Sequence, residues 1–160
     1  EGQVGHGFSR VGDYIAQMKS GKINASATPS VISQSPSYLH VSADNGFAYP
    51  ALDLAIDQAV QMAATTGCVA IAVSQSNHCG TLASHVEKLA MQGLIGIMVA
   101  NTPAAIAPWG GNRPLYGTNP IAFAAPRTGN IPLKALYIAW IKFPFRDDIF
   151  APNVGNTKSS

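Results

Sequence analysis

The stretch GCVAIAVSQSNHCGTLASHVEKLAMQGLIGIMVAN, residues 67–101, decides the fold class. Residues 68–73 and 93–101 are short apolar runs, typical of strands that are buried on both faces. Between them, residues 81–92 predict a helix whose inner face is made of Leu82, Val86, Leu89 and Ala90. The alternation of strand, helix and strand predicts an α/β protein.

The rest of the chain adds elements on both sides of this unit. Two further helices each have a glycine where a C-terminal cap belongs, Gly21 and Gly67. Pro50 is expected to open the second of these helices. The predicted elements are helices over residues 8–20 and 50–66, an irregular extended segment over 26–37, strands over 38–43 and 121–126, a turn at 44–46, and a Gly/Pro-rich loop over 106–120.

Composition narrows the class of protein. A chain of 160 residues is long enough for one domain with its own core. Only 11% of the residues are charged, which indicates that much of the surface lies against protein, either at a subunit interface or against a missing second half. The net charge of +2 and the lack of a Lys/Arg stripe argue against nucleic-acid binding.

The sequence predicts neither a membrane protein nor a secreted one. No apolar run reaches the roughly 18 residues of a membrane span. The polar opening EGQVGHG does not look like a signal peptide. Cys68 and Cys79 are the only cysteines, which suits a reducing compartment, so we expect a cytoplasmic protein.

His78 and Cys79 precede the helix predicted over 81–92. Zinc binding and thiol catalysis are two possible functions of this pair. His85 would lie about 10 Å from His78 along a helix, too far for two ligands of one zinc ion. A helix N-terminus would favour a Cys79 thiolate, but no base is evident, and an inert buried thiol is commoner. We therefore expect no metal site and no thiol chemistry.

Proton transfer by His78 is the third possibility. The helix dipole would oppose a positive imidazole and keep the ring neutral, able to bond a carbonyl or accept a hydroxyl proton. A loop histidine that caps the helix explains His78 equally well. His6 and Arg10 share one face of a helix start. Arg10 could bind a substrate carboxylate, and His6 could act on the atom next to that carboxylate. A small 2-oxo or 2-hydroxy acid requires both of these roles. The alternative for this pair is a solvated helix start.

A standard Rossmann phosphate loop is absent, because GHGFSR (5–10) has Arg10 where the third glycine should stand. Four stretches instead resemble the type 2 malate/L-lactate dehydrogenase family of NAD(P)-dependent oxidoreductases, and they lie within residues 1–133. They are GHGFSR with the following Tyr14 and SGKI, DNGFAYPALDLA (44–55), SNHCG (76–80) with QGLIGIMVANTP (92–103), and APWGGNRPLYGTNPIAFAAPR (107–127).

The resemblance implies a fold, an assembly and a site. The fold is a non-Rossmann α/β fold with a mixed, largely antiparallel sheet and surrounding helices, and the assembly is a homodimer. The cofactor is NAD(P)H and the substrate is a small carboxylate. The implied roles are proton donor for His6, second active-site histidine for His78, carboxylate recognition for Arg10, cofactor contact for Thr102, and pocket lining for Thr118 and Asn119.

Two departures from the family pattern leave alternatives open. Gly5 replaces the usual serine before the histidine, which hints at the subgroup that reduces Δ1-pyrroline-2-carboxylate and Δ1-piperideine-2-carboxylate. We expect a malate- or lactate-type 2-hydroxy acid first and a cyclic imine as the alternative. The family motif stops after residue 133, so residues 1–133 are expected to be the N-terminal part of a truncated dehydrogenase domain. Residues 134–160 would be a divergent tail, out-of-frame or disordered, and the chain could be a catalytically incomplete fragment.

Overall fold

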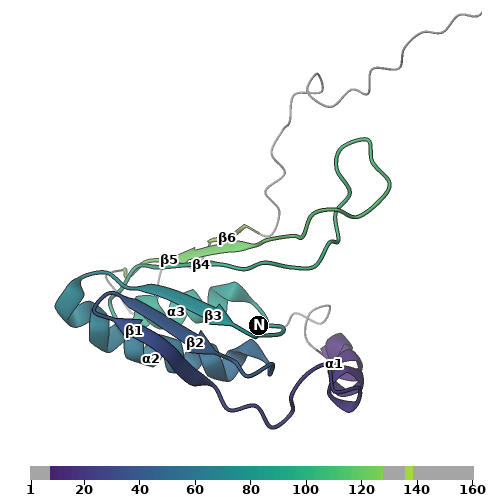
Figure 1. Ribbon diagram of the computed structural model, residues 1–160. Coiled ribbons are helices and arrows are strands. Elements are labelled where there is room, and N and C mark those ends of the chain that lie inside the picture. Colours follow the sequence, from purple (N-terminus) through teal and green to yellow (C-terminus); the bar gives the residue numbers. More distant parts are fainter. Residues whose placement is uncertain (1–7, 128–135, 139–160) are drawn as a thin grey trace, which may run out of the picture. The chain divides into compact units, whose positions relative to one another are not determined.

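The computed structural model describes residues 8–127 and the backbone of residues 136–138. These residues form an α/β arrangement, as the sequence predicts (Figure 1). A 3₁₀ turn at Phe8–Arg10 leads directly into the first helix. The elements are α1 (Val11–Lys19), β1 (Ser30–Ser35), β2 (Tyr38–Ser42), α2 (Ala48–Thr66), β3 (Ala70–Ser74), α3 (Leu82–Met91), β4 (Gly96–Val99), β5 (Ile121–Ala124) and β6 (Leu136–Ile138).

The first sheet is mixed and has the strand order β1–β2–β3. β1 lies antiparallel to β2, with an irregularity between Val31 and Ser33, and β2 lies parallel to β3. The segment expected to be irregular and extended over 26–37 therefore contains a real but bulged strand. Helix α2 makes the crossover between the two parallel strands and packs along both of them (Figure 1).

The strand, helix and strand predicted over residues 67–101 do not form one parallel unit. Their strands, β3 and β4, belong to different sheets, since β4 pairs with β5 in a second sheet of order β4–β5–β6. The parallel unit is the preceding one, β2–α2–β3. Local periodicity identified the elements correctly, but strand pairing depends on partners that lie far away in the sequence.

The core of the first sheet lies between β2 and α2. Leu39 and Val41 are completely buried on β2, and small residues of α2 pack against them. Alanines let the helix approach the sheet closely, so the two larger side chains can be fully covered. Burying each of them contributes about 1.5–3 kcal/mol relative to leaving it exposed.

Helix α2 starts two residues before the predicted Pro50 and ends where predicted. Its early start is explained by Ala48, whose N–H donates to the carbonyl oxygen of His78 at 3.3 Å. The end follows from Gly67, which has φ of +72° and donates its N–H to the carbonyl oxygen of Ala63 at 2.9 Å. A left-handed conformation of this kind is open to glycine at no steric cost.

The predicted burial of β3 and β4 on both faces is wrong for the described residues. Ile71 of β3 is 37% exposed and Ile97 of β4 is 69% exposed. On β4, Gly96 is the buried residue, and it packs against Val86 and Leu89 of α3. β4 is therefore covered on one face, with Gly96 buried and Ile97 exposed, whereas β3 has no fully buried residue within Ala70–Ser74.

Contacts divide the described residues into two compact units, one of residues 8–98 with 122–127 and one of residues 99–121. In the second unit the chain folds back on itself, and Ile106 and Tyr116 exchange backbone hydrogen bonds of 2.8 and 3.0 Å. The Gly/Pro-rich loop predicted over 106–120 is thus closed by a short antiparallel bridge. Apart from the backbone of β6, the tail predicted over 134–160 lies outside the described residues.

None of the described helices is both long enough and apolar enough to cross a membrane.

Candidate functional site

The loop that carries His78 is fixed at the carboxyl ends of the parallel strands β2 and β3. Asn45, in the turn after β2, donates its N–H to the carbonyl oxygen of Gln75 at 2.8 Å. Asn77 donates its N–H to the carbonyl oxygen of Gly46 at 2.9 Å and its side-chain amide to the carbonyl oxygen of Asn45 at 2.7 Å. The carboxyl end of parallel strands is where α/β sheets commonly bind ligands.

The hydrogen bonds of His78 define its tautomer. The N–H of Gly80 donates to Nδ1 of His78 at 3.1 Å, and the hydroxyl of Tyr14 lies 2.6 Å from the same nitrogen. A backbone N–H can only donate, so Nδ1 must accept. The neutral ring therefore carries its proton on Nε2.

Tyr14 and Tyr49 complete this side of the site. The Tyr14 ring stands edge-on to Phe47 at a centroid distance of 4.9 Å. Burial, followed by the charge of Tyr14 and a hydrogen bond with it, raises the pKa of Tyr49 to about 12. Tyr49 also lies against Gly80, where an added Cβ would come within 2.5 Å of its hydroxyl oxygen.

The sequence did not assign a role to either tyrosine. Tyr14 falls at helical spacing with the apolar residues Val11 and Ile15, and it stands in the family motif after GHGFSR. It is separated from His78 by 64 residues, and no local pattern reports a contact at that distance. A tyrosine on an apolar helix stripe is nevertheless a usable signal, because its hydroxyl usually finds a hydrogen-bond partner.

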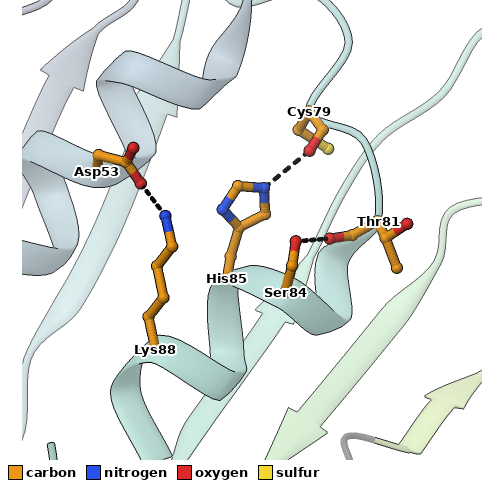
Figure 2. Close-up of polar contacts among 6 residues, drawn as sticks. All are labelled: Asp53, Cys79, Thr81, Ser84, His85 and Lys88. Atoms are coloured by element: carbon orange, nitrogen blue, oxygen red, sulfur yellow. Dashed lines mark hydrogen bonds and ion pairs between the residues drawn. The ribbon is translucent and has the colours of Figure 1, made fainter. Parts of the chain in front are cut away.

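Helix α3 is joined by hydrogen bonds to the segment that follows His78 (Figure 2). His85 is only 4% exposed, and its Nε2 donates to the carbonyl oxygen of Cys79 at 2.8 Å. The hydroxyl of Ser84 donates to the carbonyl oxygen of Thr81 at 2.7 Å. The structural role expected for His85 matches these contacts, which hold the residue that follows His78.

A thiolate at Cys79, the alternative considered from the sequence, is not favoured by its surroundings. Burial of the thiol raises its pKa. Its Sγ lies 3.9 Å from the carbonyl oxygen of Gly80. Within residues 8–127, no three His, Cys, Asp or Glu side chains lie close enough to share a metal ion.

Thr102, Thr118 and Asn119, predicted as cofactor and pocket residues, lie together in the second unit. The Thr102 hydroxyl oxygen accepts the N–H groups of Thr118 at 2.7 Å and Asn119 at 3.4 Å. The Asn119 side-chain oxygen accepts the N–H of Thr102 at 3.1 Å. Asn119 has φ of +37°, a conformation that asparagine tolerates better than most residues.

This cluster leaves one hydroxyl proton available. The Thr102 oxygen already accepts two N–H groups, so across the 3.1 Å contact between the two hydroxyls it is Thr102 that donates to Thr118. The Thr118 hydroxyl can then donate outward. Uncharged donors of this kind fit an amide or hydroxyl group of a ligand such as a nicotinamide cofactor.

The remaining two predicted residues lie at the N-terminus. Arg10 is the N-cap of α1, and its guanidinium lies 3.3 Å from the Asp13 carboxylate in a half-exposed pair. His6 lies outside the described residues. Its expected pairing with Arg10 therefore stays a prediction.

Comparison with known proteins gives a consistent result. The family described as "Malate/L-lactate dehydrogenase" matches residues 1–135. The chain is 46% identical over 133 residues to "(2R)-3-sulfolactate dehydrogenase (NADP(+))" of Chromohalobacter salexigens. That match covers 83% of this chain and 40% of that protein. It is 37% identical to the "Delta(1)-pyrroline-2-carboxylate/Delta(1)-piperideine-2-carboxylate reductase" of Pseudomonas syringae, over 83% of this chain and 39% of that protein.

The structural match points the same way. The crystal structure of the Δ1-piperideine-2-carboxylate reductase from Pseudomonas syringae superposes with a TM-score of 0.77 and 36% identity. The match covers 84% of this chain and 40% of that structure. The chain thus spans about 40% of the length of the relatives it matches, and the mixed sheet with surrounding helices is theirs as well.

Proposed function

Because the chain belongs to the malate/L-lactate dehydrogenase family, a family of NAD(P)-dependent dehydrogenases and reductases, we propose that it serves hydride transfer at the carbon next to a carboxylate. Bound NAD(P)H supplies the hydride, and the protein binds, orients and handles protons. The observation that carries the proposal is the fixed tautomer of His78, with Nδ1 accepting from Gly80.

His78 is proposed to bind the reacting oxygen of the substrate. With its proton on Nε2, the neutral ring can donate a hydrogen bond to a carbonyl oxygen that gains negative charge during reduction. It is less suited to giving the proton away, because protonation of Nδ1 would cost the Gly80 hydrogen bond. Delivery of the proton is assigned to His6, in line with the family resemblance.

Arg10 is proposed to bind the substrate carboxylate. Its pair with Asp13 is half exposed, so it contributes little and exchanges easily for a substrate carboxylate. A guanidinium can bind that carboxylate through two parallel hydrogen bonds.

Thr102, Thr118 and Asn119 are proposed to contact the cofactor and line the pocket. The outward hydroxyl proton of Thr118 would bind a carbonyl oxygen of the ligand, and Thr102 and Asn119 would hold that hydroxyl in place. Binding would then depend on the internal hydrogen bonds of the cluster.

A 2-hydroxy acid and its 2-oxo acid form the first substrate class. A carbonyl oxygen can accept the Nε2 proton of His78, whereas a protonated imine nitrogen has no lone pair to accept it. The relative with 46% identity carries the name of a sulfolactate dehydrogenase, which agrees with this class. The reductases of cyclic imino acids, 37% identical, keep the imine class as the second candidate.

Oxidation of reduced cofactor tests the substrate class. The purified chain is given NADPH or NADH with sulfopyruvate, pyruvate, oxaloacetate or Δ1-pyrroline-2-carboxylate in turn. Turnover with a 2-oxo acid supports the proposal, and turnover with the imine alone replaces it by the second candidate. A cooperative melt without any turnover would mean that this chain is a catalytically incomplete fragment.

A cytoplasmic homodimer is proposed as the assembly. Met91, Ile95 and Ile97 are each more than 60% exposed around the end of α3 and the start of β4. Contiguous exposed apolar side chains favour contact with protein. Light scattering at micromolar concentration tests this, and a monomer mass would contradict it.

A further inference from the structure

Resting on the proposed function, we propose that Tyr14 is a positioning residue that holds His78 in the tautomer with its proton on Nε2. The Gly80 N–H and the Tyr14 hydroxyl both donate to Nδ1 of His78, so the hydrogen bonds at this nitrogen have one direction. In this tautomer His78 suits a class of substrate whose reacting atom accepts a hydrogen bond from an imidazole N–H.

The direction of the hydrogen bond between Tyr14 and His78 follows from a single backbone group. The Gly80 N–H donates to Nδ1 of His78 at 3.1 Å, which fixes Nδ1 as an acceptor. The Tyr14 hydroxyl, 2.6 Å from Nδ1, must therefore donate to it.

The two donors converge on Nδ1 from different parts of the fold. Gly80 lies two residues after His78, and Tyr14 lies on α1, 64 residues away in the sequence. The imidazole ring is tilted 47° to the Tyr14 ring at a centroid distance of 5.6 Å. The other tautomer is unfavourable because it would place N–H against the Gly80 N–H and would forfeit the hydrogen bond that Tyr14 donates.

The Tyr14 ring is itself held by an aromatic contact. Its ring packs edge-on against Phe47, and Phe47 lies 6.4 Å from the ring of Tyr49. Tyr49 stays protonated over the neutral range, because burial and Tyr14 raise its pKa to about 12.

A purely structural role for Tyr14 is the competing explanation. α1 has no fully buried residue, and the Tyr14 ring joins it to Phe47 and His78. Substitution of Tyr14 by Phe keeps the ring and its packing and removes only the hydroxyl. The variant therefore separates the anchoring of α1 from the hydrogen bond to His78.

The test is ¹⁵N NMR of the His78 side chain in the full chain, compared between wild type, Tyr14→Phe, Tyr49→Phe and the control Tyr38→Phe. Tyr38 begins β2 and is partly exposed. In wild type we expect a protonated Nε2 and an unprotonated, hydrogen-bonded Nδ1. In Tyr14→Phe we expect Nδ1 to shift toward the value of a less strongly bonded nitrogen. Tyr49→Phe and Tyr38→Phe leave both donors to Nδ1 in place, so we expect no such shift in either.

An Nδ1 signal unchanged by Tyr14→Phe, or a wild-type ring protonated on Nδ1, would overturn the inference. These readouts need no turnover, so they are independent of the proposed activity. In an active protein we expect Tyr14→Phe to lower kcat about fivefold, as loss of one hydrogen bond does, with a smaller change in KM. An unaltered kcat alongside a raised KM would also overturn it.

Discussion

Nε2 of His85 donates a hydrogen bond to the carbonyl oxygen of Cys79 at 2.8 Å. This bond connects the first turns of α3 to the residue next to His78 (Figure 2). His85 itself is only 4% exposed. The bond therefore holds in place the residue that follows His78.

His85→Leu is predicted to lower the free energy of unfolding by about 1–3 kcal/mol, because it removes the buried imidazole together with its part-buried hydrogen bond to the Cys79 carbonyl oxygen. Urea denaturation measures the change. The control is Lys88→Met on the same helix, which breaks the half-exposed ion pair with Asp53 and should cost less than about 1 kcal/mol. Equal effects of the two substitutions would contradict the role given to His85.

Gly80→Ala is predicted to destabilise the chain by at least about 1 kcal/mol, because φ is +68° there and the new Cβ would lie 2.5 Å from the Tyr49 hydroxyl oxygen. Gly12→Ala is the matched control. An alanine Cβ at Gly12, inside α1, would meet nothing within 4 Å, so this variant should be up to about 1 kcal/mol more stable. Thermal melts of both variants give the comparison, and a stabilised Gly80→Ala would refute the packing described.

Cys79 is predicted to react slowly with iodoacetamide near neutral pH, whereas the exposed Cys68 reacts readily. Burial raises the pKa of the Cys79 thiol, so less of it is thiolate at any given pH, and its rate should climb only above the ordinary thiol range of about 8.5. Mass spectrometry of the two peptides over a pH series measures both rates. Faster labelling of Cys79 than Cys68 at neutral pH would revive the thiol hypothesis.

Thr102→Val is predicted to raise the KM for the nicotinamide cofactor about tenfold. It removes the oxygen that accepts the N–H groups of Thr118 and Asn119, and with it the hydrogen bond that orients the Thr118 hydroxyl. Thr28→Val is the control, since Thr28 is exposed and its contact with Asp44 uses the backbone N–H. A cofactor KM equal to that of wild type would remove Thr102 from the proposed site.

Local signals predicted much of the secondary structure. Gly21 and Gly67 have the positive φ expected just after a helix, and the helices end beside them. Burial could not be predicted in the same way, because Ile71 and Ile97 look like core residues until the number of covering layers is known. An apolar run indicates a strand, but its neighbours decide which of its faces are buried.

The candidate site, like the fold, could be predicted only in part from the sequence. The sequence identified His78, Thr102, Thr118 and Asn119 through the resemblance, and the structure brings the last three together. Tyr14 stayed without a role because its partner lies 64 residues away. Contacts between distant segments carry the positioning of this site, and a single sequence does not report them.

The most direct test of the central claim is the rate of NAD(P)H oxidation by the His78→Gln variant with the best 2-oxo acid. The account predicts a loss of about 10²–10³-fold relative to wild type, the usual contribution of one hydrogen-bond donor to the oxygen that gains negative charge. His40→Gln, which alters a β2 histidine bonded to Ser74, serves as the control and should keep most of the activity. A His78→Gln variant that turns over as fast as wild type would contradict the account.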